Sequence, residues 1–257
     1  MAAFPFQIVG FDLDGTLVDS NRDLAPAVNH ALSTVGRPAI SADATRKLIG
    51  GGARRMLERA FELTGGALPE TEFETAYGAL LVHYEAHIAD HTVSYPGCLE
   101  ALDALLERGC KLAVITNKIE VYSKKLLGAL GLTDRFALIL GGDTLGPGRA
   151  KPAPDMIDTA ILTLGGGSFA MVGDSTYDVR AARNARVPVV ALSFGYNDAP
   201  AAELGADAVI DHYDELVGAL ERLRRVLQKP QVDEGHPGAD FQRVSTWRPP
   251  DRRKTAI

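Results

Sequence analysis

Asp12 and Asp14 are two carboxylates separated by a single apolar residue, and they follow an apolar run near the N-terminus. In a β-strand, residues two apart lie on the same face, so both side chains can enter one site while Leu13 points toward the core. Such a pair suits a nucleophile beside a general acid or base. Gly15 lets the chain turn sharply, although an ordinary turn at a strand end uses the same residue types. Further polar groups along the chain favour the catalytic interpretation.

Thr116, Asn117 and Lys151 are candidate ligands for an anion. Thr116 and Asn117 follow an apolar run at a predicted strand-to-helix turn, where a hydroxyl and free backbone N–H groups can hold phosphate oxygens. A helix N-cap alone would use the same pair. Lys151 follows a glycine-rich loop and is fixed by Pro152, and a lysine held there can neutralise a phosphoryl group during transfer. These residues predict a site for a phosphate group.

Asp174 and Asp178 add two carboxylates after another apolar run, one helical turn apart. Two like charges ~4 Å apart repel by about 4 kcal/mol at an effective dielectric constant of about 20. If Asp12 joins these two carboxylates near an anion, the site requires a cation. Because the ligands are hard oxygens and no His or Cys supports them, the residues favour Mg²⁺ over zinc.

Short apolar runs alternate with longer amphipathic segments, which predicts a parallel sheet covered by helices. The expected fold class is α/β, a doubly wound, Rossmann-like parallel sheet with a small all-helical domain inserted after the first strand. The predicted strands cover residues 7–11, 111–116, 137–141, 169–173, 187–192 and 208–210. The predicted helices of the insertion cover residues 20–35, 41–48, 53–63 and 70–90. Ligands of open parallel sheets bind beyond the carboxyl ends of the strands, where the polar residues are expected to meet.

This pattern also predicts the domain boundaries. Residues 1–16 and 93–227 are expected to form the α/β core, and residues 17–92 the helical insertion. Residues 228–257 contain four prolines, mixed charge and no sustained period, which predicts a flexible tail that Phe241 or Trp247 could dock.

The composition of the 257 residues excludes several classes of protein. A formal net charge of −6 gives no electrostatic reason to bind nucleic acid, and no apolar stretch approaches the roughly 20 residues that cross a bilayer. Residues 1–10 show no secretory signal, and two scattered cysteines do not suggest a disulfide framework. We therefore expect a cytoplasmic protein, monomeric or homodimeric, that binds a small phosphorylated metabolite and neither nucleic acid nor membranes.

The order and spacing of these polar groups resemble the four motifs of the haloacid dehalogenase superfamily, over about residues 6–227. The helical insertion is similar to the family's small cap domain. Three segments look like the phosphoglycolate phosphatase branch of that family, at residues 48–54, 112–118 and 194–196.

The resemblance implies a Mg²⁺-dependent phosphoryl transfer in two steps. Asp12 would attack phosphorus and become an aspartyl phosphate, while Asp14 protonates the leaving group and then activates water. Thr116, the backbone of Asn117 and Lys151 would bind the phosphoryl oxygens.

The metal ligands that the resemblance implies are the Asp12 carboxylate, the Asp14 main-chain carbonyl and Asp174, with Asp178 nearby. An aspartate at position 14 implies a phosphate-ester substrate, because dehalogenases of the family lack it.

The implied reaction converts 2-phosphoglycolate to glycolate and phosphate. Gly50, Gly51 and Arg54, or the neighbouring Arg55, could provide donors for the substrate carboxylate. The alternatives are a sugar phosphomutase of the β-phosphoglucomutase type and a broad-specificity sugar-phosphate phosphatase. A binding or scaffold protein on a retired phosphatase fold is a further alternative, which the intact set of polar residues disfavours.

Overall fold

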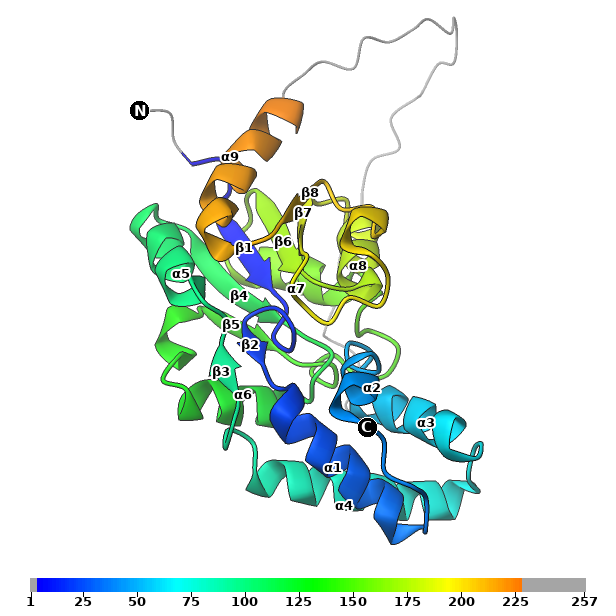
Figure 1. Ribbon diagram of the computed structural model, residues 1–257. Coiled ribbons are helices and arrows are strands. Elements are labelled where there is room, and N and C mark those ends of the chain that lie inside the picture. The colour runs from blue at the N-terminus through cyan, green and yellow to red at the C-terminus, as the bar shows by residue number, and fades with distance from the viewer. Residues whose placement is uncertain (1–3, 228–257) are drawn as a thin grey trace, which may run out of the picture.

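A computed structural model describes residues 4–227, so the predicted tail at 228–257 lies outside the described residues. Six strands form one fully parallel sheet: β1 (Ile8–Phe11), β4 (Lys111–Ile115), β5 (Leu138–Leu140), β6 (Phe169–Gly173), β7 (Val189–Leu192) and β8 (Ala208–Ile210). Their spatial order is β5-β4-β1-β6-β7-β8, with β1 in the middle (Figure 1). The expected doubly wound α/β class is therefore confirmed, and each sheet strand lies within a predicted one.

Helices cover both faces of this sheet, because its strands are apolar on both sides. Val9 and Phe11 of β1 join one apolar cluster, while Ile8 joins the cluster on the opposite face. The first cluster includes residues of α5 (Cys98–Glu107), α6 (Glu120–Ala129) and α9 (Leu216–Leu227), and the second includes residues of α7 (Asp155–Thr163) and α8 (Thr176–Asn184). Three short 3₁₀ helices complete the core, at Thr133–Arg135, Ala201–Glu203 and Tyr213–Glu215.

Four helices follow β1 before the chain reaches α5: α1 (Asn21–Thr34), α2 (Ala42–Arg46), α3 (Ala53–Thr64) and α4 (Glu70–Ala86). They gather beyond one end of the sheet (Figure 1). Before and after these helices the chain forms two short strands, β2 (Val18–Asp19) and β3 (Val93–Ser94). The two strands pair with each other antiparallel. The sequence did not predict this pair, because two-residue strands leave no readable period.

Pro26 lies inside α1 without ending the helix. A proline removes the hydrogen bond to the carbonyl four residues earlier, which here belongs to Arg22. Both residues are exposed, so water can satisfy that carbonyl. Among the helices of residues 4–227, none combines the length and the apolar character that crossing a membrane requires.

Candidate active site

Asp12 and Asp14 follow the carboxyl end of β1, at the centre of the sheet. The Asp12 N–H donates to the carbonyl of Val172 on the neighbouring β6, with an N···O distance of 3.0 Å, and this extends the strand pairing into the site. Gly15 then adopts a φ of +84°, and a Cβ there would lie 2.4 Å from Oδ2 of Asp174. Only glycine suits both the conformation and the close approach.

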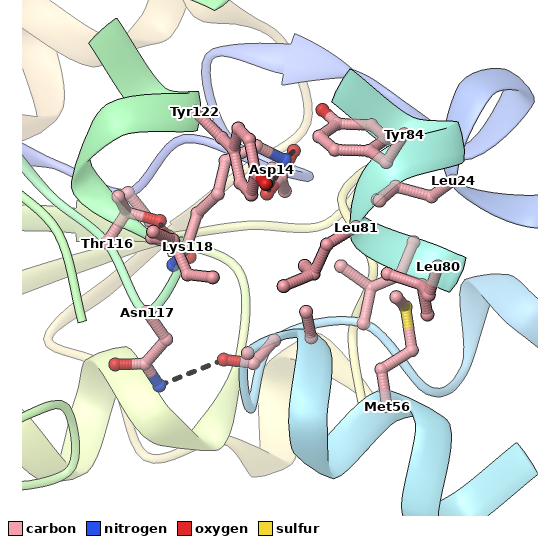
Figure 2. A pocket seen from close by; sticks show the side chains of 16 residues that line it. Asp14, Leu24, Met56, Leu80, Leu81, Tyr84, Thr116, Asn117, Lys118 and Tyr122 are labelled. Carbon is pink, nitrogen blue, oxygen red and sulfur yellow. Dashed lines mark hydrogen bonds and ion pairs between the residues drawn. The ribbon is translucent and has the colours of Figure 1, made fainter. Parts of the chain in front are cut away.

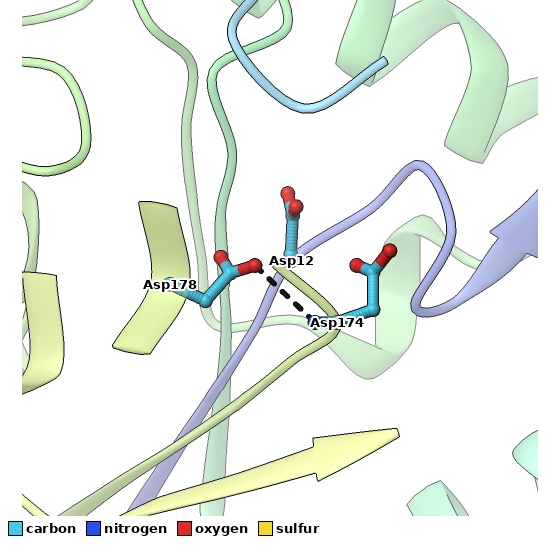
Figure 3. Close-up of side chains that lie close together, drawn as sticks. All are labelled: Asp12, Asp174 and Asp178. Atoms are coloured by element: carbon cyan, nitrogen blue, oxygen red, sulfur yellow. Dashed lines mark hydrogen bonds between the residues drawn. The ribbon is translucent and has the colours of Figure 1, made fainter. Parts of the chain in front are cut away.

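Asp12, Asp174 and Asp178 are buried side by side, and each offers a carboxylate oxygen within 4.8 Å of the other two (Figure 3). Nζ of Lys151 lies 2.9 Å from Asp12 Oδ1 and 2.5 Å from Asp178 Oδ1. Burial raises the pKa of Asp12 to about 6, with Lys151 opposing the rise and Asp178 adding to it. Burial and the charges of Asp178 and Asp12 also raise the pKa of Asp174. One ammonium thus pairs with two of the three clustered carboxylates, and the cluster carries excess negative charge.

Asp178 is held by the protein through both oxygens. Its Oδ2 accepts hydrogen bonds from the N–H of Asp174 (3.2 Å), the N–H of Ser175 (3.1 Å) and the Ser175 hydroxyl (2.7 Å). The bond from the Ser175 N–H belongs to the capping box of α8. Its Oδ1 faces Lys151. Gly173 permits this packing, because a Cβ there would lie 2.3 Å from Asp178 Cγ. Asp178 is therefore placed to position Lys151, whereas Asp12 and Asp174 are less fully hydrogen-bonded.

Asp174 is oriented by two donors from different parts of the chain. The Thr16 hydroxyl donates to its Oδ1 at 2.7 Å, and the N–H of Tyr196 donates to its Oδ2 at 2.6 Å. Each oxygen retains a further lone pair. Three buried carboxylates with one lysine, and with oxygen donors throughout, fit a hard divalent cation.

Asp14 lies in a different charge environment from Asp12. The Ser20 hydroxyl donates to its Oδ1 at 2.5 Å, and Nζ of Lys118 lies 3.1 Å and 2.9 Å from its two oxygens. The same Nζ lies 4.4 Å from the ring centroid of Tyr84, a residue of α4. Burial alone would lower the pKa of Lys118, but Asp14 and Tyr84 outweigh it and raise this pKa. The two aspartates that follow β1 therefore suit different roles. Asp12 belongs to an anionic cluster, whereas Asp14 belongs to an ion pair with no net charge.

Lys118 is a charged residue of the site whose role the sequence did not reveal, and Thr16, Ser20 and Tyr84 were missed as well. Lys118 follows Thr116 and Asn117 directly, and this position next to two predicted phosphate ligands was the feature of the sequence that could have identified it. A lone lysine in a sequence usually marks a solvated surface, whereas this one is buried.

A cavity of about 40 Å³ lies between the carboxyl edge of the sheet and the helical insertion (Figure 2). The sheet side contributes Asp12, Asp14, Thr116, Asn117, Lys118, Ile119 and Tyr122, and the insertion contributes Leu24, Ile49, Gly50, Gly52, Ala53, Met56, Leu80, Leu81 and Tyr84. Nδ2 of Asn117 donates to the carbonyls of Gly50 and Lys151, both at 3.0 Å. The Asn117 side chain thus ties the insertion to two loops of the sheet.

The structure brings most of the predicted site residues together, with two exceptions in the insertion. A Cβ at Gly51 would lie 2.8 Å from the Tyr177 hydroxyl, and Gly51 is not among the residues lining the cavity. Arg54 is hydrogen-bonded to Glu74 and lines a separate pocket with Arg55. The geometry therefore gives Arg54 no contact with the cavity.

Comparison with known proteins places this architecture in one family. Residues 9–192 match the haloacid dehalogenase-like hydrolases. A phosphoglycolate phosphatase of Agrobacterium fabrum is 44% identical over 212 residues, covering 82% of this chain and 90% of the relative. A second, from Mesorhizobium japonicum, is 40% identical over 221 residues, covering 85% and 96%.

Solved structures agree with the sequence comparison. A crystal structure of a predicted phosphoglycolate phosphatase from Haemophilus somnus has a TM-score of 0.76 and 33% identity, covering 83% of this chain and 97% of that one. The chain belongs to the haloacid dehalogenase-like hydrolase family, within which it is a phosphoric monoester hydrolase.

Proposed function

We propose that this hydrolase is a Mg²⁺-dependent phosphatase that converts 2-phosphoglycolate to glycolate and phosphate through an aspartyl phosphate. The observation that carries the proposal is the buried cluster in which Asp12 lies 2.9 Å from Lys151 and beside Asp174. The relatives named phosphoglycolate phosphatase, 36–44% identical to this chain, support the choice of substrate.

Asp12 is the nucleophile in this mechanism. Its carboxylate oxygen bonds to phosphorus while the P–O bond to the glycolate oxygen breaks. The protonated form of Asp14, in equilibrium with its ion pair to Lys118, gives its proton to that oxygen. Water then attacks the aspartyl phosphate and gives a proton to Asp14, and inorganic phosphate leaves. Because Lys118 and Ser20 hold Asp14 apart from the anionic cluster, the acid and the nucleophile keep separate roles.

Thr116, the Asn117 backbone and Lys151 are proposed to bind the phosphoryl oxygens, where charge is spread in the transition state. Asp12, the Asp14 main-chain carbonyl and Asp174 would hold Mg²⁺, which would neutralise the repulsion between Asp12 and the phosphate. Asp178 holds Lys151 in place.

The size of the cavity favours a phosphatase for a small ester over the alternatives left open by the sequence. The cavity of about 40 Å³ is small, and apolar side chains of the insertion such as Leu24, Met56 and Leu80 form much of its wall. A hexose ring would need a larger space with many hydrogen-bonding groups. We propose that residues 17–92 act as a cap that limits the substrate to two or three carbons, and that the enzyme works in the cytoplasm.

A panel of phosphate esters tests this function. With Mg²⁺ we expect kcat/KM for 2-phosphoglycolate to exceed that for hexose phosphates by about 100-fold or more. Release of inorganic phosphate measures the rate, and a chelator in excess provides the control. Interconversion of hexose phosphates without phosphate release, or undiminished activity in the chelator, would contradict the proposal.

Arg54→Ala is expected to change KM for 2-phosphoglycolate by less than about twofold, because Arg54 pairs with Glu74 at the surface and exposed pairs contribute little. Steady-state kinetics of this variant and the wild type check the expectation. A tenfold rise in KM would mean that the side chain leaves Glu74 and reaches the substrate.

A further inference from the structure

The cavity contains a positive charge and an unused hydroxyl that the phosphoryl chemistry does not require. Within the described chain, Lys118 is the only cation among the sixteen residues that line the cavity. Beside it lies Tyr84 of α4, whose side chain lines the same cavity (Figure 2) and whose residue is only 2% exposed. The two side chains come from opposite sides of the cavity, one from the sheet and one from the insertion.

The Tyr84 hydroxyl has no hydrogen-bond partner within residues 4–227. A buried polar group without a partner is costly, and native proteins satisfy almost all of them. Burial also raises the pKa of Tyr84 to about 12, against the opposing charge of Lys118, so the group stays an O–H donor at neutral pH. A ligand oxygen in the cavity would satisfy it.

Lys118 likewise has donor capacity to spare. An ammonium carries three N–H donors, and within the described residues its hydrogen-bond acceptors are the two oxygens of Asp14. The centroid of the Tyr84 ring lies 4.4 Å from the same Nζ. A second anionic group that enters the cavity would therefore meet an ammonium fixed by Asp14 and a hydroxyl fixed by α4.

The reach of the substrate fits this arrangement. In 2-phosphoglycolate a single CH₂ separates the carboxylate carbon from the ester oxygen, and Asp14 must protonate that oxygen when the P–O bond breaks. A cation that recognises the carboxylate must then lie close to Asp14. Lys118 touches Asp14 directly.

We propose that Lys118 and Tyr84 together form the subsite that recognises the carboxylate of the substrate, in place of Arg54. This inference rests on the proposed function and names the residues that select a carboxylated ester. One donor comes from the sheet and the other from the insertion, so the subsite spans both sides of the cavity.

The test compares 2-phosphoglycolate with ethyl phosphate, which has a methyl group where the carboxylate stands. Tyr84→Phe removes only the hydroxyl and keeps the ring packed. We expect it to raise KM for 2-phosphoglycolate about tenfold with little change in kcat, and to leave KM for ethyl phosphate within about twofold. Lys118→Met is expected to lower the ratio of kcat/KM for 2-phosphoglycolate to kcat/KM for ethyl phosphate by about 100-fold. Loss of the ion pair with Asp14 would change both rates and so leave this ratio unaffected.

Two matched variants serve as controls. Tyr95→Phe removes another buried hydroxyl that lacks a partner within residues 4–227 but lies outside the cavity lining, and Lys124→Met removes an exposed lysine of α6. Both are expected to keep the wild-type ratio. In an Asp12→Asn background, which cannot turn the ester over, Tyr84→Phe should also weaken calorimetric binding of 2-phosphoglycolate about tenfold.

The outcomes separate this inference from the function on which it rests. If the wild type prefers 2-phosphoglycolate but Tyr84→Phe and Lys118→Met affect both esters equally, the subsite is wrong and the function stands. If the wild type hydrolyses ethyl phosphate as efficiently as 2-phosphoglycolate, the choice of substrate fails and the subsite fails with it.

Discussion

Asp12→Asn is expected to lower kcat for 2-phosphoglycolate by at least ~10⁴-fold while making the metal-free protein more stable at pH 7. The loss of turnover follows because an amide cannot replace the nucleophilic carboxylate. The gain in stability follows because Asp12 is one of three clustered buried carboxylates, and the one lysine among them pairs with only Asp12 and Asp178. Removing one charge is expected to raise the free energy of unfolding by about 2 kcal/mol, which corresponds to roughly 4–8 °C in Tm for a domain of this size.

The pH dependence of this stability difference has a definite sign. Burial raises the pKa of Asp12 in the folded state to about 6 from its ordinary value of 3.8. Between these values the folded protein holds a proton that the unfolded chain has released, so metal-free wild-type stability falls as pH rises from about 4 to above 6. The Asp12→Asn variant lacks this contribution, and its advantage in Tm should grow over the same interval. Thermal unfolding of both proteins in chelator, from about pH 4.5 to about pH 7.5, measures it.

Added Mg²⁺ supplies the control for the same pair of proteins. A cation that binds the folded state raises Tm by mass action, and it should do so for the wild type more than for Asp12→Asn. If the Asp12→Asn variant is less stable than the metal-free wild type at pH 7, the charge argument is contradicted. If the variant still turns over the substrate, Asp12 is not the nucleophile.

Asp14→Asn is expected to lower both turnover and stability, although the substitution is the same and only two residues away. Asp14 is the carboxylate partner of Lys118, and removing one member of a buried ion pair typically costs about 3–5 kcal/mol. Without an acid for the leaving oxygen, kcat for 2-phosphoglycolate should fall by about 10²–10⁴-fold. Circular dichroism melts and phosphate release measure the two effects.

Acetyl phosphate distinguishes the acid role of Asp14 from a general loss of structure. Its leaving group is acetate, which needs no proton, and it is small enough for a tight cavity. We expect Asp14→Asn to slow its hydrolysis far less than that of 2-phosphoglycolate. The double variant Asp14→Asn/Lys118→Met should recover much of the lost stability but none of the turnover, and equal losses on both esters would argue against acid catalysis.

Two features were predictable from the sequence because they depend on local pattern. The apolar runs predicted every strand of the sheet, since a parallel sheet is buried on both faces and its strands read as short hydrophobic segments. The placement of Asp12, Thr116 and Asp174 after such runs predicted their convergence, because the carboxyl ends of parallel strands share one edge.

Tertiary structure alone decided how charge is divided among these residues. Asp12 and Asp14 are equivalent in the sequence, yet Lys151 and Asp174 surround the first while Lys118 and Ser20 hold the second. Most of those partners lie far away along the chain, and no local period encodes which side chains meet across a site.

The insertion shows the same division between pattern and packing. Its helical period predicted four helices, and four are present between β2 and β3. The sequence also suggested Arg54 as a ligand for the substrate carboxylate, because an arginine beside glycines suits an anion. In the folded chain Arg54 pairs with Glu74 of the next helix, α4. The buried Tyr84 of the same helix lines the cavity instead. Sequence determined which elements form and which edge carries the chemistry. The direction of each side chain depended on neighbours that only the folded chain brings within a few ångströms.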